Sequence, residues 1–179
     1  MLIKVTNEVL YHINRKNSLN TYELLQIGDV VETSKKKFNP FRNSYEIGFQ
    51  LFEQNPVGSA QMYWRFTKEY IIEDTRLAIN PNLPSRWYGL WLSDEEHLAY
   101  WEHFALKEDY QIVKMKLNGV LFEGDAHWIE LPPSPLKKVR EYAQYYWQGS
   151  IFRFGKMEYI FEGRAEVIEI VKRSYNSKY

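Results

Sequence analysis

Three short stretches of the chain carry residue types that could bind or transform a ligand. They are YHINRKNSL (11–19), which contains His12, PSRWYGLWLSDEEHLAYW (84–101), and KMEYIFEGRAEVIEI (156–170), which contains Glu158. A neutral imidazole both donates and accepts a hydrogen bond, so His12 is either a packed histidine or a group that holds a ligand hydroxyl. Aromatic rings offer stacking surfaces, and a carboxylate can stabilise a developing positive charge. The residues alone leave both interpretations of His12 open.

Several kinds of chemistry are excluded by what the sequence lacks. It contains no Cys, which removes disulfides, thiolate catalysis and cysteine-based metal sites. It has no GxGxxG, no Walker loop, no GxSxG and no HExxH. The four histidines lack the spacing of a zinc site. His97 and His103 lie six residues apart in one expected helix, and we expect both at the surface or the helix edge; we expect His127 to be structural.

Length and composition fit one ordinary domain, 1–179, with a substantial hydrophobic core. Aromatic residues make up 17% of the chain, and such rings build both cores and concave ligand sites. The 23 basic residues balance the 23 acidic residues, so the chain lacks the positive charge of non-specific nucleic-acid binders. No segment approaches the roughly 20 apolar residues of a membrane span. We therefore expect a soluble, cytoplasmic protein without a membrane partner.

The hydrophobic pattern predicts strands and helices without regular alternation. Strands are expected over 8–13, 27–33, 89–93, 110–119, 157–163 and 165–172, and helices over 18–25, 46–79, 94–105 and 134–148. Ser93 with Glu96 predicts a capping box for the third helix, and Ser134 with Pro135 predicts the start of the fourth. The basic segment 34–45 is expected to be an exposed loop. This order favours an α+β fold rather than a doubly wound parallel sheet.

Strand alternation assigns side chains to faces. It places Leu10 and His12 on one side of the first strand, and Tyr11 and Ile13 on the other. In the late strand, Glu158 and Glu162 share a face, so alternation alone does not choose between them.

The order of the three stretches resembles the ADP-ribosyltransferase superfamily, in its branch with a His, an aromatic residue and a Glu. The matching residues are Tyr11-His12, the run Gly89-Leu90-Trp91-Leu92-Ser93, and the run from Glu158 through apolar residues to Gly163. More closely, "LPSR" (83–86) and "EGRAEVIEIV" (162–171) are similar to an uncharacterised bacterial family that is grouped with that superfamily. The resemblance spans about residues 8–172.

This resemblance implies an ADP-ribosyltransferase-like split antiparallel β-sheet with flanking helices. It also implies NAD as the substrate and cleavage of the nicotinamide–ribose bond, by ADP-ribosyl transfer or by NAD hydrolysis. Glu158, His12 and Trp91 would be catalytic: Glu158 would stabilise the oxocarbenium-like sugar, and Trp91 would stack on the nicotinamide. His12 would hold a hydroxyl of the adenosine ribose, and Arg86 would meet the pyrophosphate.

The resemblance adds Arg15 and Ser93 to the residues expected to bind the nucleotide, and it predicts no metal site. His12 is expected to face Trp91 and Glu158 across a nucleotide-sized cleft. The acceptor of ADP-ribose stays open between protein, nucleic acid, small molecule and water.

A second hypothesis is a non-catalytic nucleotide-binding or protein-interaction module on the same fold. Trp91 stands where active members usually carry Tyr, and a Trp stacks but has no hydroxyl. Each residue also has a structural interpretation: Trp91 as a core residue, Arg86 as a loop anchor in a salt bridge, and Glu158 as a solvent-facing carboxylate rivalled by Glu162 and Glu166.

Overall fold

A computed structural model of the chain describes residues 2–16, 23–33, 55–106, 109–152 and 156–175. The strands are β1 (Leu2–Lys16), β2 (Val30–Glu32), β3 (Leu90–Leu92), β4 (Asp109–Asp125) and β5 (Met157–Ser174). The α-helices are α2 (Pro56–Ile79), α3 (Leu98–Glu102) and α4 (Leu136–Trp147), and two 3-10 helices cover His103–Ala105 and Ala126–Trp128. The expected α+β class is confirmed. The predicted loop 34–45 and most of the predicted helix 18–25 lie outside the described residues.

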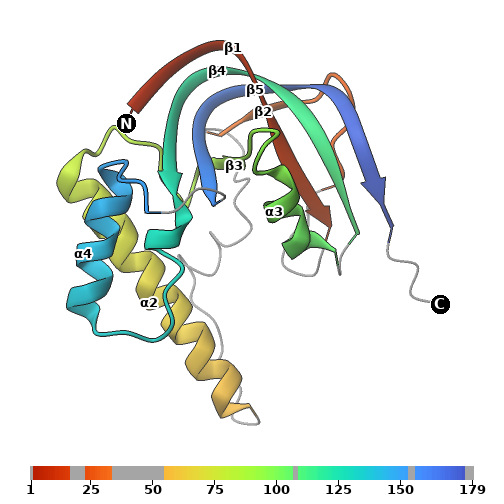
Figure 1. Ribbon diagram of the computed structural model, residues 1–179. Coiled ribbons are helices and arrows are strands. Elements are labelled where there is room, and N and C mark those ends of the chain that lie inside the picture. Colours follow the sequence, from red (N-terminus) through yellow and green to blue (C-terminus); the bar gives the residue numbers. More distant parts are fainter. Residues whose placement is uncertain (1, 17–22, 34–54, 107–108, 153–155, 176–179) are drawn as a thin grey trace.

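One antiparallel sheet of five strands forms the centre of the molecule. Its order is β1-β4-β5-β2, and β3 pairs with β5 beside β2. Just after β3, Ser93 and Tyr11 of β1 exchange two backbone hydrogen bonds of 2.8 Å. The path of hydrogen-bonded strands therefore returns through β3 to β1. Figure 1 shows β1, β4 and β5 arching together over β3.

The two faces of this curved sheet bury different clusters. One face carries mostly aliphatic side chains from all five strands, together with one aromatic ring, that of Phe161; the buried residues are Leu10, Val31, Leu90, Leu92, Val113, Met115, Leu117, Leu121, Phe161 and Val167. The other face packs against the helices. There Phe122 and Ile160 meet Ile72 of α2 and Tyr146 of α4, and Trp91 packs against the same cluster. Tyr11 and Ile13 pack beside Leu98 of α3 in a third cluster, so the alternation predicted for the first strand is confirmed.

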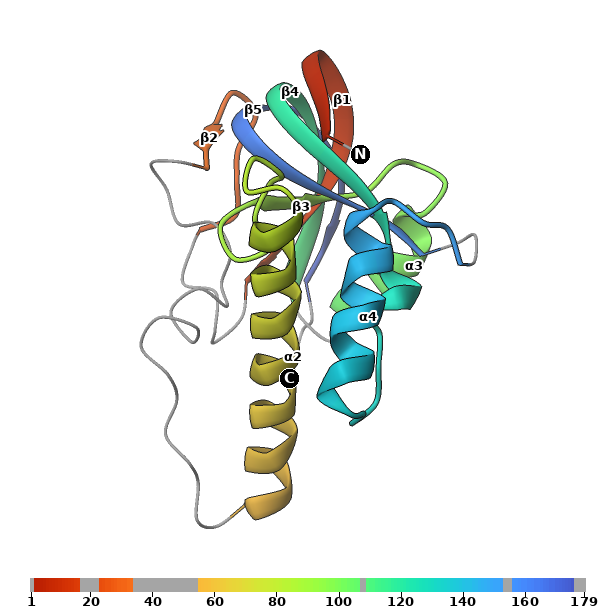
Figure 2. The same cartoon turned by 90° about the vertical axis from the view of Figure 1, so that its left-hand side faces the viewer.

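Helices α2 and α4 lie side by side below one end of the sheet (Figure 2). Asn55 caps α2 by accepting a 2.8 Å hydrogen bond from the Gly58 amide, and Pro56 occupies the first turn, where no amide donor is needed. The buried face of α2 is unusual because it is charged. Glu69, Glu73 and Arg76 recur at i, i+4 and i+7 around Ile72, and all are buried.

Some predicted boundaries are wrong for identifiable reasons. The helix after β3 begins at Leu98, because Ser93 Oγ donates to the Asp94 carbonyl and the Asp94 carboxylate accepts the His97 amide at 2.8 Å. The predicted capping box is therefore absent. Ser134 likewise bonds the Pro132 carbonyl, and Pro135 is the N-cap of α4. The two late strands form one strand that continues through Gly163.

Gly163 sits where β5 has a conformation that side chains rarely adopt. Its φ is +144°, it pairs with Gly119 across β4, and a Cβ would come within 2.8 Å of the Gly119 Cα. We expect Gly163→Ala to lower the free energy of unfolding by about 2 kcal/mol or more. Gly28→Ala is the control, because Gly28 also has positive φ but an added Cβ meets nothing within 4 Å. Urea titration should give a clearly smaller loss there, and equal losses would contradict the steric account.

Within the part of the chain that the structure describes, no helix combines the length and the apolar character that crossing a membrane requires.

Candidate functional site

Arg86 is the centre of a buried polar cluster where the loop after α2 meets the start of β5. Its Nε donates to Glu69 of α2 at 3.0 Å, and its Nη1 forms an ion pair with Glu158 of β5. Tyr146 of α4 lies 3.1 Å from the same Nη1 and donates to Glu158 Oε1 at 2.5 Å. All four side chains are buried. The cluster therefore joins four separate segments of the chain around one guanidinium.

The charges in this cluster shift one another. Burial acts against the charged guanidinium, but Glu158 and Glu69 outweigh it and raise the pKa of Arg86 well above its usual value. Burial raises the pKa of Glu158 although Arg86 and the Tyr146 hydroxyl oppose it. Burial, followed by the charge of Glu158, also raises the pKa of Tyr146. Arg86 is therefore a permanent cation, whereas Glu158 holds its proton more strongly than an ordinary carboxyl.

Trp91 forms an aromatic floor against this cluster. The Arg86 guanidinium carbon lies 4.8 Å from the centre of the Trp91 ring, within cation–π range, and Trp91 Nε1 donates to the Arg86 carbonyl at 3.2 Å. Trp91 pairs in register with Ile160, so its side chain leaves the sheet on the same face as Glu158. The ring is only partly buried. The structure thus brings Arg86, Trp91 and Glu158 together, three residues that the sequence predicted.

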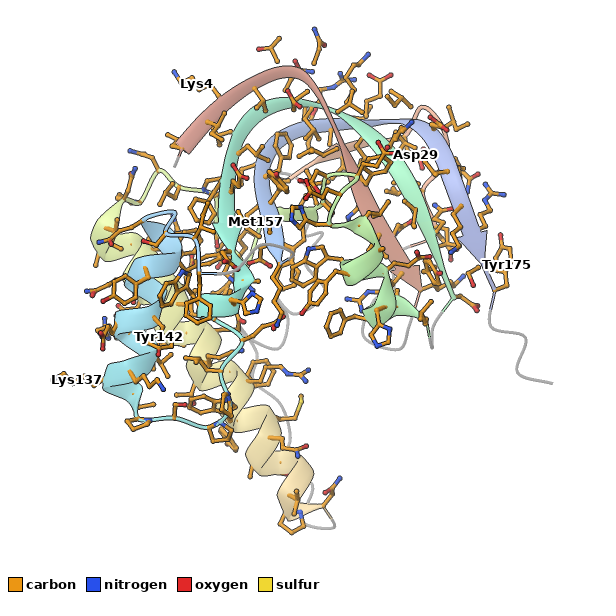
Figure 3. All side chains as sticks on the ribbon, in the orientation of Figure 1. Lys4, Asp29, Lys137, Tyr142, Met157 and Tyr175 are labelled. Carbon is orange, nitrogen blue, oxygen red and sulfur yellow. The ribbon has the colours of Figure 1, made fainter. Side chains whose placement is uncertain are left out.

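A second indole completes this region from α3. Trp101 is partly buried and donates Nε1 to the Met157 carbonyl at 2.7 Å, one residue before Glu158. Figure 3 labels Met157 below the arch of strands, in that view between α4 and α3. The start of β5 is therefore flanked by two partly exposed tryptophans, Trp91 and Trp101.

A second buried ion pair fixes the loop that carries Arg86. Arg76 donates to both oxygens of Glu73 and to the carbonyls of Pro81 and Leu83. Ser85 donates its hydroxyl to Glu73 and its amide to Glu162, both at 2.8 Å. The two candidate carboxylates of β5 therefore have different contacts. Glu158 contacts Arg86, whereas Glu162 accepts a hydrogen bond from the loop that carries Arg86. Glu166 faces Lys116 and Arg164 at the surface.

His12 does not face Trp91 and Glu158 across a cleft, and that expectation is wrong. Its side chain leaves β1 on the face of Leu10, whereas the side chains of Trp91 and Glu158 lie on the helix-bearing face. What His12 reaches is the Trp91 backbone, where its Nδ1 donates to the carbonyl oxygen at 2.8 Å. Burial lowers the pKa of His12 to about 4, so the ring is neutral at pH 7. His12 therefore supports β3 from behind the site.

The lowered pKa of His12 predicts a pH-dependent stability. The pKa of His12 is 6.5 in the unfolded chain and about 4 in the folded chain, so between these pH values the unfolded chain binds a proton that the folded chain does not. The free energy of unfolding therefore falls as the pH falls through this window. The expected loss is up to about 3 kcal/mol. Urea titrations at pH 7 and pH 4.5 should show a smaller decrease for His12→Asn, whose amide can still donate to Trp91. The same decrease in both proteins would remove His12 as its cause.

Ser93 and Arg15 are the remaining residues that the resemblance predicted to bind the nucleotide. Ser93 is buried and bonds the Asp94 carbonyl, so its hydroxyl is used within the turn. Arg15 lies on β1 opposite Tyr110, on the other face from His12. His97 is buried rather than exposed, which corrects our expectation, and its Nδ1 lies 2.7 Å from the Asp94 carboxylate.

Two residues of the cluster, Glu69 and Tyr146, were missed at the sequence level. The spacing of Glu69, Glu73 and Arg76 on one helical face was a usable signal, but such residues are ordinarily solvent-exposed. Tyr146 follows Val139 and Ala143 at helical spacing on the buried face of α4, a spacing that does not distinguish a core residue from a site residue. Among the described residues, no three His, Asp or Glu side chains gather as a metal site requires. The cluster places a partly buried indole beside a buried guanidinium that is paired with a buried carboxylate.

The chain matches the model of a known protein family. Residues 53–173 match the model of a family described as a protein of unknown function (DUF2441). The matched range contains Glu69, Arg86, Trp91, Tyr146 and Glu158, whereas β1 with His12 and Arg15 lies before it. No curated protein matches the chain.

Proposed function

Since the chain belongs to the DUF2441 family, whose description names no activity, we propose its function from the site itself. The protein binds NAD against Trp91 and cleaves the nicotinamide–ribose bond, as an ADP-ribosyltransferase or NAD glycohydrolase. The observation that carries this proposal is the contact of Arg86 with both Trp91 and Glu158. Three residues that the resemblance singled out meet at one place, two from the stretch 84–101 and one from the stretch 156–170.

The pairing of the strands supports the proposal of an ADP-ribosyltransferase-like fold. The three stretches of the resemblance lie on β1, β3 and β5, and β3 contacts both of the others. Residues far apart in sequence therefore become neighbours at the end of one short strand. This is the arrangement that a site assembled from these three stretches requires.

Each side chain has a distinct task in the proposed reaction. The cationic nicotinamide stacks on a partly exposed indole, that of Trp91. As the bond to the ribose breaks, positive charge develops on the sugar, and the Glu158 carboxylate stabilises it. Arg86 and Tyr146 hold that carboxylate in place through hydrogen bonds. A role for Arg86 at the pyrophosphate would require the guanidinium to exchange one of its two carboxylate partners.

The second candidate is a non-catalytic module that binds a nucleotide or a protein partner. The observation in its favour is the burial of Glu158. Its side chain is only 6% exposed and is bonded to both Arg86 and Tyr146. A carboxylate held in this way reaches a sugar only after the cluster opens. The Trp at position 91, which lacks a phenolic hydroxyl, points in the same direction.

One pair of measurements separates the two candidates. The protein is incubated with NAD while nicotinamide is followed by chromatography, and binding of NAD is measured by calorimetry. The enzyme releases nicotinamide in proportion to protein concentration, whereas the module binds NAD without release. Absence of binding would remove both nucleotide-based functions.

A further inference from the structure

The start of β5, which carries Glu158, is an edge of the sheet. Its first two residues, Met157 and Glu158, pair with β4 on one side. On the other side the pairing with β3 ends at Tyr159, since the chain after β3 turns away and Ser93 pairs with Tyr11 of β1. Among the described residues, no further strand pairs with β5 at Met157 and Glu158. The proposed catalytic carboxylate therefore projects from a strand edge, where backbone groups need partners from outside the sheet.

Trp101 of α3 supplies such a partner. Its indole Nε1 donates to the Met157 carbonyl at 2.7 Å. The ring also packs against the buried cluster that α2 and α4 form with the sheet. An indole has a single donor and only two rotatable side-chain bonds, so a packed indole directs its N–H at little entropic cost. This hydrogen bond therefore holds the backbone one residue before Glu158.

A second set of contacts joins α3 to the same part of the chain. The Tyr100 hydroxyl donates to Glu130 Oε1 at 2.8 Å. Glu130 in turn forms an ion pair with Lys156, the residue immediately before Met157. The Lys156 ammonium lies 5.4 Å from the centre of the Tyr100 ring, and the Tyr100 and Trp101 rings meet edge-on with centroids 4.9 Å apart. All five residues of α3 are partly or fully exposed. The helix is therefore connected to two successive residues, 156 and 157, just before Glu158.

We propose that Trp101 is a positioning residue for Glu158, because its hydrogen bond to Met157 fixes the strand edge from which the carboxylate projects. This inference rests on the proposed cleavage of NAD. Arg86 and Tyr146 align the carboxylate itself, whereas Trp101 acts on the backbone that carries it. Without the indole donor, the Met157 carbonyl would bond to water and the first residues of β5 would fray. The carboxylate would then be aligned for less of the time, so cleavage would slow while binding of NAD is kept.

The first test removes the donor of Trp101. In Trp101→Phe, which keeps an aromatic ring, the kcat for nicotinamide release is expected to fall about tenfold with KM little changed, since misplacement by about 1 Å can cost up to about 100-fold. Replacement of Trp101 by benzothienylalanine, in which sulfur takes the place of the indole N–H, keeps the shape of the ring and should give the same loss. Replacement by azatryptophan, which retains the N–H, should restore kcat. If benzothienylalanine at this position leaves kcat unchanged, the hydrogen bond does not position Glu158.

Trp128→Phe is the matched control. Trp128 is also partly buried, packs against the same cluster, and donates its Nε1 to a backbone carbonyl, that of Ser150, at 2.8 Å. Its replacement removes the same kind of hydrogen bond, but from a segment that does not carry Glu158. We expect both variants to lose stability in a urea titration and only Trp101→Phe to lose kcat. Equal losses of kcat in the two variants would overturn the inference.

The titration of Glu158 gives a readout that does not depend on turnover. Burial raises the pKa of Glu158, and NMR of the glutamate carboxyl carbons measures it, with Glu158→Gln identifying the signal. In Trp101→Phe the pKa should move towards that of an ordinary Glu, because water reaches the loosened strand end. In Trp128→Phe it should not move.

The outcomes separate this inference from the function on which it rests. Nicotinamide release by the wild type, with kcat and the Glu158 titration both unchanged in Trp101→Phe, would overturn the role of Trp101 and leave the proposed function standing. Absence of nicotinamide release from the wild type would remove the proposed function. A Glu158 titration that still moves in Trp101→Phe alone would then support the positioning of the carboxylate by Trp101, and an unmoved titration would overturn that as well.

Discussion

Glu158→Gln is expected to abolish nicotinamide release from NAD, with a rate at least about 100-fold below that of the wild type. Glutamine keeps the size of the side chain and an oxygen that accepts from Arg86 and Tyr146. It carries no charge, however, and so cannot stabilise the positive sugar. Binding of NAD should therefore be largely retained while turnover is lost. The measurement is the initial rate of nicotinamide release, with binding followed separately by calorimetry.

Glu162→Gln is the matched control for this variant. Glu162 lies four residues further along β5 on the same face, and its carboxylate accepts a hydrogen bond from the Ser85 amide, whereas Glu158 forms the ion pair with Arg86. Its replacement should change the rate by no more than a few fold. Unchanged turnover in Glu158→Gln, or equal losses in the two variants, would remove Glu158 from the catalytic role.

Arg86→Ala is expected to produce a large loss of stability, about 3–5 kcal/mol of the free energy of unfolding. The substitution leaves the buried carboxylates of Glu69 and Glu158 without their shared partner. It also removes the cation that packs against the Trp91 ring. Urea titration at pH 7 measures the loss, and the remaining carboxylates should take up protons more readily as a result.

Arg140→Ala provides the comparison for this loss. Arg140 pairs with Asp74 at 2.7 Å, but both side chains are about half exposed. Such surface pairs contribute about 1 kcal/mol or less. If Arg86→Ala costs no more than Arg140→Ala, the buried cluster does not hold β5, α2 and the loop before β3 together.

Much of the fold followed from local patterns. Period-two alternation identified β1 and assigned Leu10 and Tyr11 to opposite faces, and both assignments are confirmed. Boundaries were less predictable, because they depend on which backbone groups a polar side chain selects. Ser93 was expected to cap a helix, yet its hydroxyl donates to the adjacent Asp94 carbonyl. The Asp94 side chain instead accepts the His97 amide before the helix begins.

The candidate site was predictable in its members more than in its arrangement. Arg86, Trp91 and Glu158 do meet, but the contact of Glu158 with Arg86 could not be anticipated from either stretch alone. Glu69 was missed because an acidic residue on a helix is ordinarily solvated, and only the tertiary position of Arg86 makes its burial tolerable. His12 was placed in the cleft because the pairing of β1 with β3 was unknown. That pairing directs its ring to the Trp91 backbone from the opposite face.

The most direct test of the account is a crystal structure of the protein with carba-NAD, an NAD analogue in which a methylene replaces the ring oxygen of the nicotinamide ribose so that the bond is not cleaved. The account predicts the nicotinamide ring on Trp91 and a hydroxyl of its ribose within hydrogen-bond distance of the Glu158 carboxylate. A nucleotide bound elsewhere on the molecule, with the Arg86–Glu158 ion pair unchanged and Trp91 without a ligand, would contradict it.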